Sequence, residues 1–230
     1  MGRLPIGGCD FSTRPYTYDD LPSGDTDEDL QKFALQPEDL YHKIPLIEAA
    51  TKARNASIKL VASPWSAPSW MKTNGRIDGK GKLKQQYWSS WAQYIVRFLA
   101  EYRQLGVEVW AITAQNEPSQ DLSYSIINAM GWTMEEQAEW VGGYLGPALQ
   151  DAGFGSTKIY VLDDIRLVLP EWLHALMSNN ASRGFVSGVA VHWYLDFLVP
   201  SSVLDETHRQ YPDVPILYTE ACTGQWPWQP

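Results

Sequence analysis

The chain has 230 residues, 44% of them hydrophobic and 20% charged, a composition typical of a globular domain that excludes a disordered chain or a membrane span. Its net charge of −9 argues against a nucleic-acid partner, because a basic patch is the usual footprint of nucleic-acid binding. Cys9 and Cys222 form no zinc-like spacing with histidines and cannot build a disulfide framework. We therefore expect both cysteines to be small buried residues, and no metal or cofactor.

The first half of the chain alternates predicted strands and helices. Acidic residues within the polar stretch 13–36 are expected to be solvated, and Pro45 is tolerated in the first turn of a helix. Between Tyr87 and Leu105 apolar side chains recur at helical spacing, and Gly106 follows as a C-cap. The predicted elements are a strand at Arg3–Cys9, a helix from Ile44, a strand at Ile58–Ser63, a long loop to Lys84, the helix Tyr87–Leu105 and a strand at Val107–Ala114.

The second half continues this alternation. Thr133 and Glu136 have the spacing of a capping box, which predicts a helix starting there. The predicted elements are a helix at Thr133–Asp151, a strand at Lys158–Leu162 ending in Asp163-Asp164, a helix at Pro170–Ser178, a strand at Val186–Val191, a helix near Ser202–His208, a strand at Val214–Thr219 and a tail from Gly224 to Pro230.

About six strands alternating with helices predict a parallel sheet joined by right-handed crossovers. A doubly wound fold would carry a glycine-rich phosphate loop, and neither of the usual motifs is present. A (β/α)₈ TIM barrel fits better, although it needs eight strands. We therefore predict that residues 1–230 are one catalytic domain, an incomplete TIM barrel of about strands 2 to 7.

Two predicted strands end in a glutamate. The apolar run Trp110–Ala114 leads into Gln115-Asn116-Glu117-Pro118, and Val214–Thr219 leads into Glu220. In a barrel of parallel strands both ends open on one face, so the two carboxylates can meet. Such a pair is typical of glycosidases, at a separation of about 5 Å in retaining enzymes and roughly 6.5–9.5 Å in inverting ones. The sequence gives no distance and leaves both open, while 11 Trp and 12 Tyr favour a sugar site.

At these residues the chain resembles the lysosomal acid β-glucosidases, or β-glucosylceramidases, of glycoside hydrolase family thirty. The resemblance covers nearly the whole chain and depends on many short matches in order: Cys9-Asp10-Phe11-Ser12, Ala62-Ser63-Pro64-Trp65, Lys72-Thr73-Asn74-Gly75, Asn116-Glu117-Pro118, Leu162-Asp163-Asp164, the stretch Ala190-Val191-His192-Trp193-Tyr194-Leu195-Asp196, and Glu220-Ala221-Cys222.

The resemblance implies that Glu117 is the acid/base and Glu220 the nucleophile of a retaining mechanism. Asn116 would bond the 2-hydroxyl of the sugar, a contact that strengthens in the oxocarbenium-like transition state.

Further site residues follow from the same resemblance. Asp10 and Trp65 match glucose-binding positions, and His192 and Tyr194 match residues near the nucleophile. Tyr124 lies in a poorly matching loop and is not assigned.

Several neighbouring residues are expected to support the site without reacting. Asp163, Asp164 and Arg166 are interpreted as an ion network. Trp70 and Trp193 are interpreted as packing residues.

The function implied by the resemblance is hydrolysis of glucosylceramide to glucose and ceramide. It also implies a saposin-type activator, an anionic lipid surface and a lysosomal, membrane-associated or secreted location, although no signal peptide is apparent at Met1–Pro5. By family comparison the first and eighth barrel strands and a β-sandwich domain are absent. The alternatives are another β-glycosidase of the family, or an inactive fragment of such an enzyme.

Overall fold

A computed structural model describes residues 1–79, 81–119 and 127–222 of the chain. Tyr124 and the tail from Gly224 lie outside these residues. Six strands are found, β1 (Gly2–Ile6), β2 (Leu60–Pro64), β3 (Ala111–Thr113), β4 (Lys158–Ile165), β5 (Val186–His192) and β6 (Ile216–Glu220). The helices are α1 (Ile44–Arg54), α2 (Trp88–Gln104), α3 (Met134–Trp140), α4 (Gly146–Asp151), α5 (Glu171–Ser178) and α6 (Ser202–Gln210).

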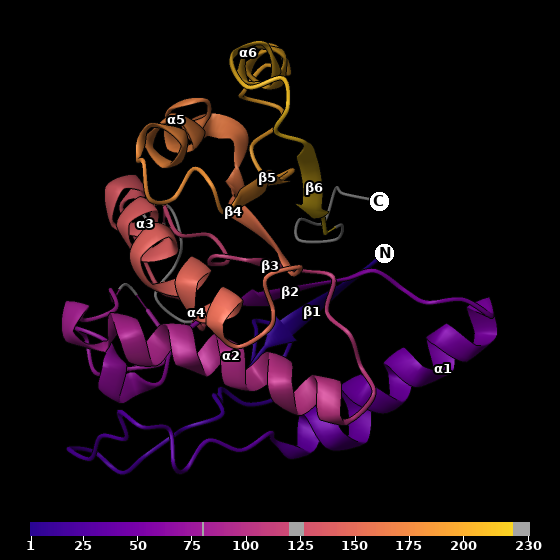
Figure 1. The fold of residues 1–230 in the computed structure, drawn as a ribbon, viewed down its shortest axis with the longest axis vertical. Coiled ribbons are helices and arrows are strands. Elements are labelled where there is room, and N and C mark those ends of the chain that lie inside the picture. Colours follow the sequence, from indigo (N-terminus) through magenta and orange to yellow (C-terminus); the bar gives the residue numbers. More distant parts are fainter. Residues whose placement is uncertain (80, 120–126, 223–230) are drawn as a thin grey trace.

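The strands form one parallel sheet in chain order, from β1 at one edge to β6 at the other. Figure 1 shows the sheet curling around its inner face while the helices follow its outer side. This half-barrel confirms the predicted incomplete TIM barrel. Within the described residues, β1 and β6 are the two edge strands of this sheet.

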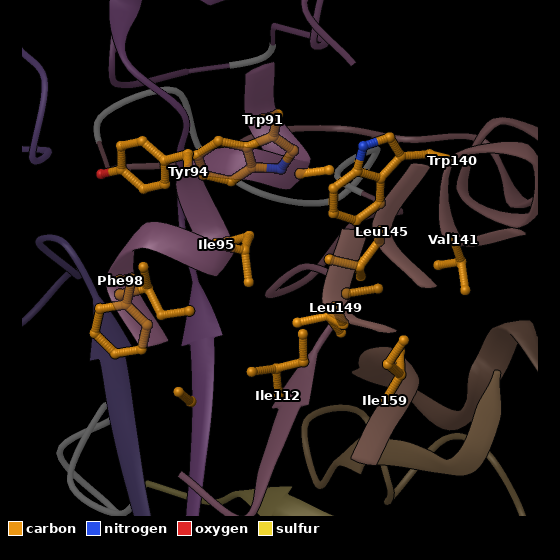
Figure 2. Packing of buried hydrophobic residues seen from close by; sticks show 14 of the residues in the cluster. Trp91, Tyr94, Ile95, Phe98, Ile112, Trp140, Val141, Leu145, Leu149 and Ile159 are labelled. Atoms are coloured by element: carbon orange, nitrogen blue, oxygen red, sulfur yellow. The ribbon is translucent and has the colours of Figure 1, made fainter. Parts of the chain in front are cut away.

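The core lies between α2 and the strands beneath it. Figure 2 shows the α2 side chains Trp91, Ile95 and Phe98 facing Ile112 of β3 and Leu149 of α4. All five are almost inaccessible to solvent. The helical spacing of the aromatic and aliphatic residues in α2 therefore creates one apolar face, and its burial holds the helix on the sheet.

The helix predicted at Thr133–Asp151 begins as expected but does not stay regular. Thr133 Oγ1 accepts the backbone N–H of Glu136, whose carboxylate accepts the N–H of Thr133, so the capping box is confirmed. A wider π-helical turn at Val141–Leu145 then separates α3 from α4. Gly142 lies in this turn, where a Cβ atom would come within 2.5 Å of the backbone nitrogen of Ser182. Close contact with a neighbouring segment thus accompanies the widened turn.

Several strand boundaries also differ from prediction. The strand predicted at Lys158–Leu162 runs to Ile165, so Asp163 and Asp164 lie within it and not beyond its end. The strand expected at Arg3–Cys9 ends at Ile6, because Gly7 adopts a φ of 78° that turns the chain out of the sheet. The strand expected at Val107–Ala114 pairs only over Ala111–Thr113. Apolar sequence therefore extends beyond the residues that hydrogen-bond in the sheet.

The acidic run is not uniformly solvated, contrary to expectation. Asp20, Asp25 and Asp29 are exposed, but Asp19 is only 2% exposed. The indole N–H of Trp70 donates to the backbone oxygen of Asp19 at 3.0 Å, and this bond holds Asp19 against the buried Trp70 side chain. Burial and the nearby acidic charges raise the pKa of Asp19 to about 6.

Candidate active site

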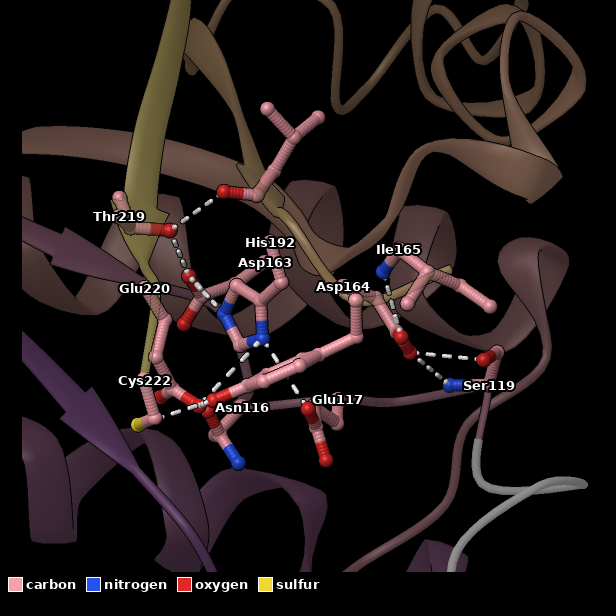
Figure 3. Close-up of polar contacts among 12 residues, drawn as sticks. Asn116, Glu117, Ser119, Asp163, Asp164, Ile165, His192, Thr219, Glu220 and Cys222 are labelled. Carbon is pink, nitrogen blue, oxygen red and sulfur yellow. Dashed lines mark hydrogen bonds and ion pairs between the residues drawn. The ribbon is translucent and has the colours of Figure 1, made fainter. Parts of the chain in front are cut away.

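The two strand-end glutamates meet across the mouth of the half-barrel. Glu117 follows β3 and Glu220 ends β6, and curvature of the sheet brings both to one end of it (Figure 3). One carboxylate oxygen from each and a ring nitrogen of His192 all lie within 4.8 Å of one another. The structure therefore brings together the pair that the sequence predicted, although Glu117 and Glu220 are far apart in the chain.

His192 lies between the two glutamates and is fully buried. Its Nδ1 is 3.1 Å from Glu117 Oε1 and 3.8 Å from Glu220 Oε1, while Nε2 is 3.1 Å from Asp163 Oδ1. Burial disfavours a charge on the ring, but the surrounding carboxylates outweigh it, with Asp163 contributing most, and raise the pKa of His192 to about 10. His192 therefore links both glutamates to Asp163, in surroundings that favour the protonated ring.

Arg3 is a second cation in the site and was missed by the sequence analysis. Its guanidinium forms an ion pair with Glu220 and donates to Asn116 Oδ1 at 2.8 Å and to Asp163 Oδ2 at 2.7 Å. Burial by itself would lower the pKa of Arg3, but Asp163 and Glu220 raise it. The available signal was a charged residue inside an otherwise apolar strand, where such a side chain requires an ionic partner.

Asp163 binds both Arg3 and His192. Its side chain is fully buried and also accepts the hydroxyls of Thr113 at 2.7 Å and Thr219 at 2.6 Å. Burial would raise the pKa of Asp163, but Arg3 and His192 hold it well below its usual range. The carboxylate therefore stays ionised and fixes both cations, as the predicted supporting role requires.

The backbone around Glu117 is strained and held from β4. Glu117 has a φ of 46°, in the left-handed region that residues other than glycine seldom adopt. Its N–H donates to the backbone oxygen of Asp163 at 2.9 Å. Just beyond it, the N–H and hydroxyl of Ser119 donate to Asp164 Oδ2 at 2.9 and 2.7 Å. Asp163 and Asp164 thus fix the orientation from which the Glu117 side chain leaves the backbone.

Asp164 should make the fold more stable in acid. Burial and the charge of Glu117 raise the pKa of Asp164 to about 6. The folded-state pKa lies above the unfolded value of about 3.9. The stability that Asp164 contributes is therefore fully present below pH 3.9 and is lost as the pH rises through about 6. Between pH 4 and pH 7.5 the free energy of unfolding, measured with urea, should change with pH by up to ~3 kcal/mol less in Asp164→Asn than in the unsubstituted chain. Identical pH dependence in both proteins would contradict this account.

Tyr194 and Cys222 contact the nucleophile candidate from the open edge. The Tyr194 hydroxyl lies 2.9 Å from Glu220 Oε1 and 3.1 Å from Cys222 Sγ. Burial, Cys222 and Glu220 together raise the pKa of Tyr194, so its hydroxyl remains a proton donor. Cys9 and Cys222 are both only partly buried, and Cys222 has a polar partner, so the expectation of two buried apolar cysteines is wrong.

The remaining predicted site residues differ in their contacts with the side chains around Glu117 and Glu220. Asn116 is buried and held by Arg3. Trp65 is 4% exposed, and the Arg3 guanidinium lies 4.6 Å from its ring centroid. Asp10 is exposed in the turn that follows β1, at the same end of the sheet.

Arg166 does not belong to the network with Asp163 and Asp164, contrary to expectation. It pairs with Asp196 at 2.9 Å, donates to the Tyr218 hydroxyl at 3.0 Å, and bonds the backbone oxygen of Val199. Arg166 therefore ties the segment after β5 to β6, beside the site.

Among the described residues, Glu117, His192 and Glu220 form a group with metal-ligand atoms close together. Arg3 already pairs with Glu220, and the surroundings of His192 favour a protonated ring. A metal ion would have to displace that proton and overcome the charge of Arg3, so the donor set fits proton transfer better.

Comparison with known proteins identifies the family. The model of the glycosyl hydrolase family 30 TIM-barrel domain matches residues 1–229. The chain belongs to glycosyl hydrolase family 30. It is 43% identical to the lysosomal acid glucosylceramidase of Mus musculus over 99% of this chain and 44% of that protein. It is 40% identical to putative glucosylceramidase 4 of Caenorhabditis elegans, again over 99% of this chain and 44% of the relative. The family 30 chain thus spans less than half the length of these relatives.

Solved structures agree with the fold of this family 30 chain. SrfJ from Salmonella typhimurium superposes with a TM-score of 0.86 at 32% identity, covering 98% of this chain and 48% of SrfJ. The endo-β1,6-glucanase BT3312 superposes with a TM-score of 0.85 at 29% identity, covering 97% of this chain and 49% of the glucanase. Among the described residues, no helix has the length and apolar character needed to cross a membrane.

Proposed function

We propose that the chain carries the catalytic pair of a retaining β-glucosidase, with Glu220 as nucleophile and Glu117 as acid/base. The observation that carries this proposal is that one oxygen of the Glu117 carboxylate lies within 4.8 Å of one oxygen of the Glu220 carboxylate. Retaining enzymes hold their carboxyl groups about 5 Å apart, whereas inverting enzymes leave roughly 6.5–9.5 Å for a water molecule.

The proposed reaction has two steps. Glu220 attacks the anomeric carbon and forms a glycosyl-enzyme while Glu117 gives its proton to the departing oxygen. Glu117 then takes a proton from water, which attacks the same carbon and releases the sugar and Glu220. Arg3 forms an ion pair with Glu220 and so places a positive charge beside the proposed nucleophile. Asn116, held by Arg3, would accept or donate a bond to the 2-hydroxyl.

The proposed substrate is glucosylceramide, cleaved to glucose and ceramide in sphingolipid metabolism. Support comes from the relatives at 43% and 40% identity that are named glucosylceramidases. Exposed apolar side chains also follow Tyr194 in the chain, namely Phe197 at 83% and Leu198 at 68% exposure. They offer a surface for the apolar part of such a lipid.

The proposed setting is that of the mammalian relative, the lysosomal lumen at a lipid surface. A saposin-type activator and anionic lipid would then present the substrate, and secretion is the alternative location. These proposals concern the whole protein, since the chain covers 44% of the length of that relative.

A rival within the family is cleavage of a β-linked glucan. It is favoured by the endo-1,6-beta-D-glucanase neg1 of Aspergillus fumigatus, which is 34% identical over 97% of this chain. Glucosylceramide in detergent should be compared with a β-1,6-glucan and with matched aryl β-glucoside, β-xyloside and β-galactoside. Release of glucose from glucosylceramide and the β-glucoside is expected. Faster cleavage of the glucan would favour the rival, and no cleavage by a folded chain would favour an inactive fragment.

A further inference from the structure

Lys72 is a fully buried lysine outside the catalytic group. Its ammonium donates to Ser66 Oγ at 3.0 Å, to the backbone oxygen of Ile77 at 2.8 Å and to that of Ala129 at 2.6 Å. A lysine ammonium has three N–H donors, and these three uncharged acceptors use all of them. Lys72 is therefore fully bonded, by partners that do not neutralise its charge.

The three acceptors come from two parts of the chain, and only Ala129 is distant from Lys72 in sequence. Ser66 follows β2, Ile77 lies in the long loop, and Ala129 lies beyond the next strand. Backbone bonds also join these two parts of the chain, from the Gly79 N–H to the oxygen of Ile127 at 3.1 Å and from the Ala129 N–H to the oxygen of Ile77 at 3.4 Å. The Lys72 ammonium therefore reinforces the contact between segments 65–79 and 127–131, and it bonds the Ser66 hydroxyl at the same time.

Segment 65–79 begins with a residue of the candidate site. Trp65 precedes Ser66, and its backbone oxygen accepts the side-chain amide of Gln115 at 2.9 Å, next to Asn116. Its ring lies against the Arg3 guanidinium, which pairs with Glu220. A shift at Ser66 would therefore be transmitted to Trp65 and to the cation beside the nucleophile.

The charge of Lys72 is unfavourable for folding. Burial lowers the pKa of Lys72 to about 7, against a smaller opposite effect of Asp78. An apolar side chain of similar length would fill this space without burying a charge, so filling the space does not account for a lysine. Its directed bonds to three acceptors in two segments account for it.

We propose that Lys72 is a positioning residue that fixes the Trp65 loop in the shape that binds the sugar. This inference rests on the proposed glycosidase function and adds to it a determinant of sugar affinity. The ammonium does not touch the reacting atoms. It acts through Ser66 on Trp65, so its loss should weaken binding more than it slows the chemical step.

The test compares Lys72→Met with Lys82→Met. The second substitution removes an exposed lysine of the same loop, which pairs with Glu136 of α3. We expect Lys72→Met to raise the Kd of an iminosugar inhibitor about tenfold and to speed amide hydrogen exchange at Gly79 and Ala129 about tenfold. The rate of covalent labelling at saturating cyclitol epoxide should change by less than about twofold. Lys82→Met should leave all three unchanged.

Unchanged affinity and exchange in folded Lys72→Met would overturn the proposal. Faster exchange with unchanged affinity would also overturn it, because Lys72 would then be merely structural. Failure of the proposed function is distinguishable, since the unsubstituted chain itself would then bind no iminosugar. If Lys72→Met does not fold, Ser66→Ala removes one acceptor and keeps the lysine, and about threefold weaker binding is expected. Unchanged affinity in folded Ser66→Ala would overturn the proposal.

Discussion

Replacing Glu220 by glutamine is expected to abolish covalent labelling of the chain by a cyclitol epoxide. The amide keeps the size of the side chain and can still accept a bond from Arg3, but it cannot attack carbon as a carboxylate does. We expect labelling to slow by about 10³-fold or more. Intact-protein mass spectrometry measures the adduct, and peptide mapping locates it.

Glu206→Gln is the matched control for this experiment. Glu206 is an exposed glutamate of α6 that pairs with Arg209 and, within the described residues, not with any residue of the candidate site. Its replacement should leave labelling unaltered. An adduct that forms equally fast in Glu220→Gln, or that maps to another residue, would show that Glu220 is not the nucleophile.

Replacing Arg3 by methionine is expected to destabilise the chain by about 3–5 kcal/mol at pH 7. The substitution leaves Asp163 buried and Glu220 partly buried without the cation that pairs with both. Urea unfolding followed by circular dichroism measures the free energy of unfolding. The loss should shrink as the pH falls, since the carboxylates can then take up protons.

Arg14→Met tests whether this effect depends on burial. Arg14 pairs with Glu38 at 2.7 Å, but its side chain is 46% exposed. Exposed ion pairs contribute about 0–1 kcal/mol. Equal effects of the two substitutions would show that Arg3 is not the electrostatic centre of the site.

The architecture could be predicted because its signals are local. Helix α2 has its apolar residues on one face, and α3 starts at a capping box. Alternating strands and helices then imply a parallel sheet, whose strand ends share one side. That rule was enough to bring Glu117 and Glu220 together without any knowledge of the distance between them.

What was missed depends on tertiary contacts. Whether Arg3 faces the inside of the barrel or solvent follows from the curvature of the sheet, and no local pattern specifies it. The burial of Asp19 beneath Trp70 and the pairing of Arg166 with Asp196 likewise join residues from different segments. From charge alone, Asp19 was expected to be exposed to solvent, and Arg166 was expected to share an ion network with Asp163 and Asp164. Both interpretations were wrong.

Thermal unfolding of the 230-residue chain, with and without a saturating iminosugar inhibitor of β-glucosidases, tests the central claim most directly. That claim is that six strands suffice to hold Glu117 and Glu220 as a sugar site. Circular dichroism should show one cooperative transition, and the inhibitor should raise its midpoint by about 2–4 °C for each kcal/mol of binding free energy. A cooperative transition that saturating inhibitor leaves unmoved would contradict the claim, and so would the absence of any cooperative transition.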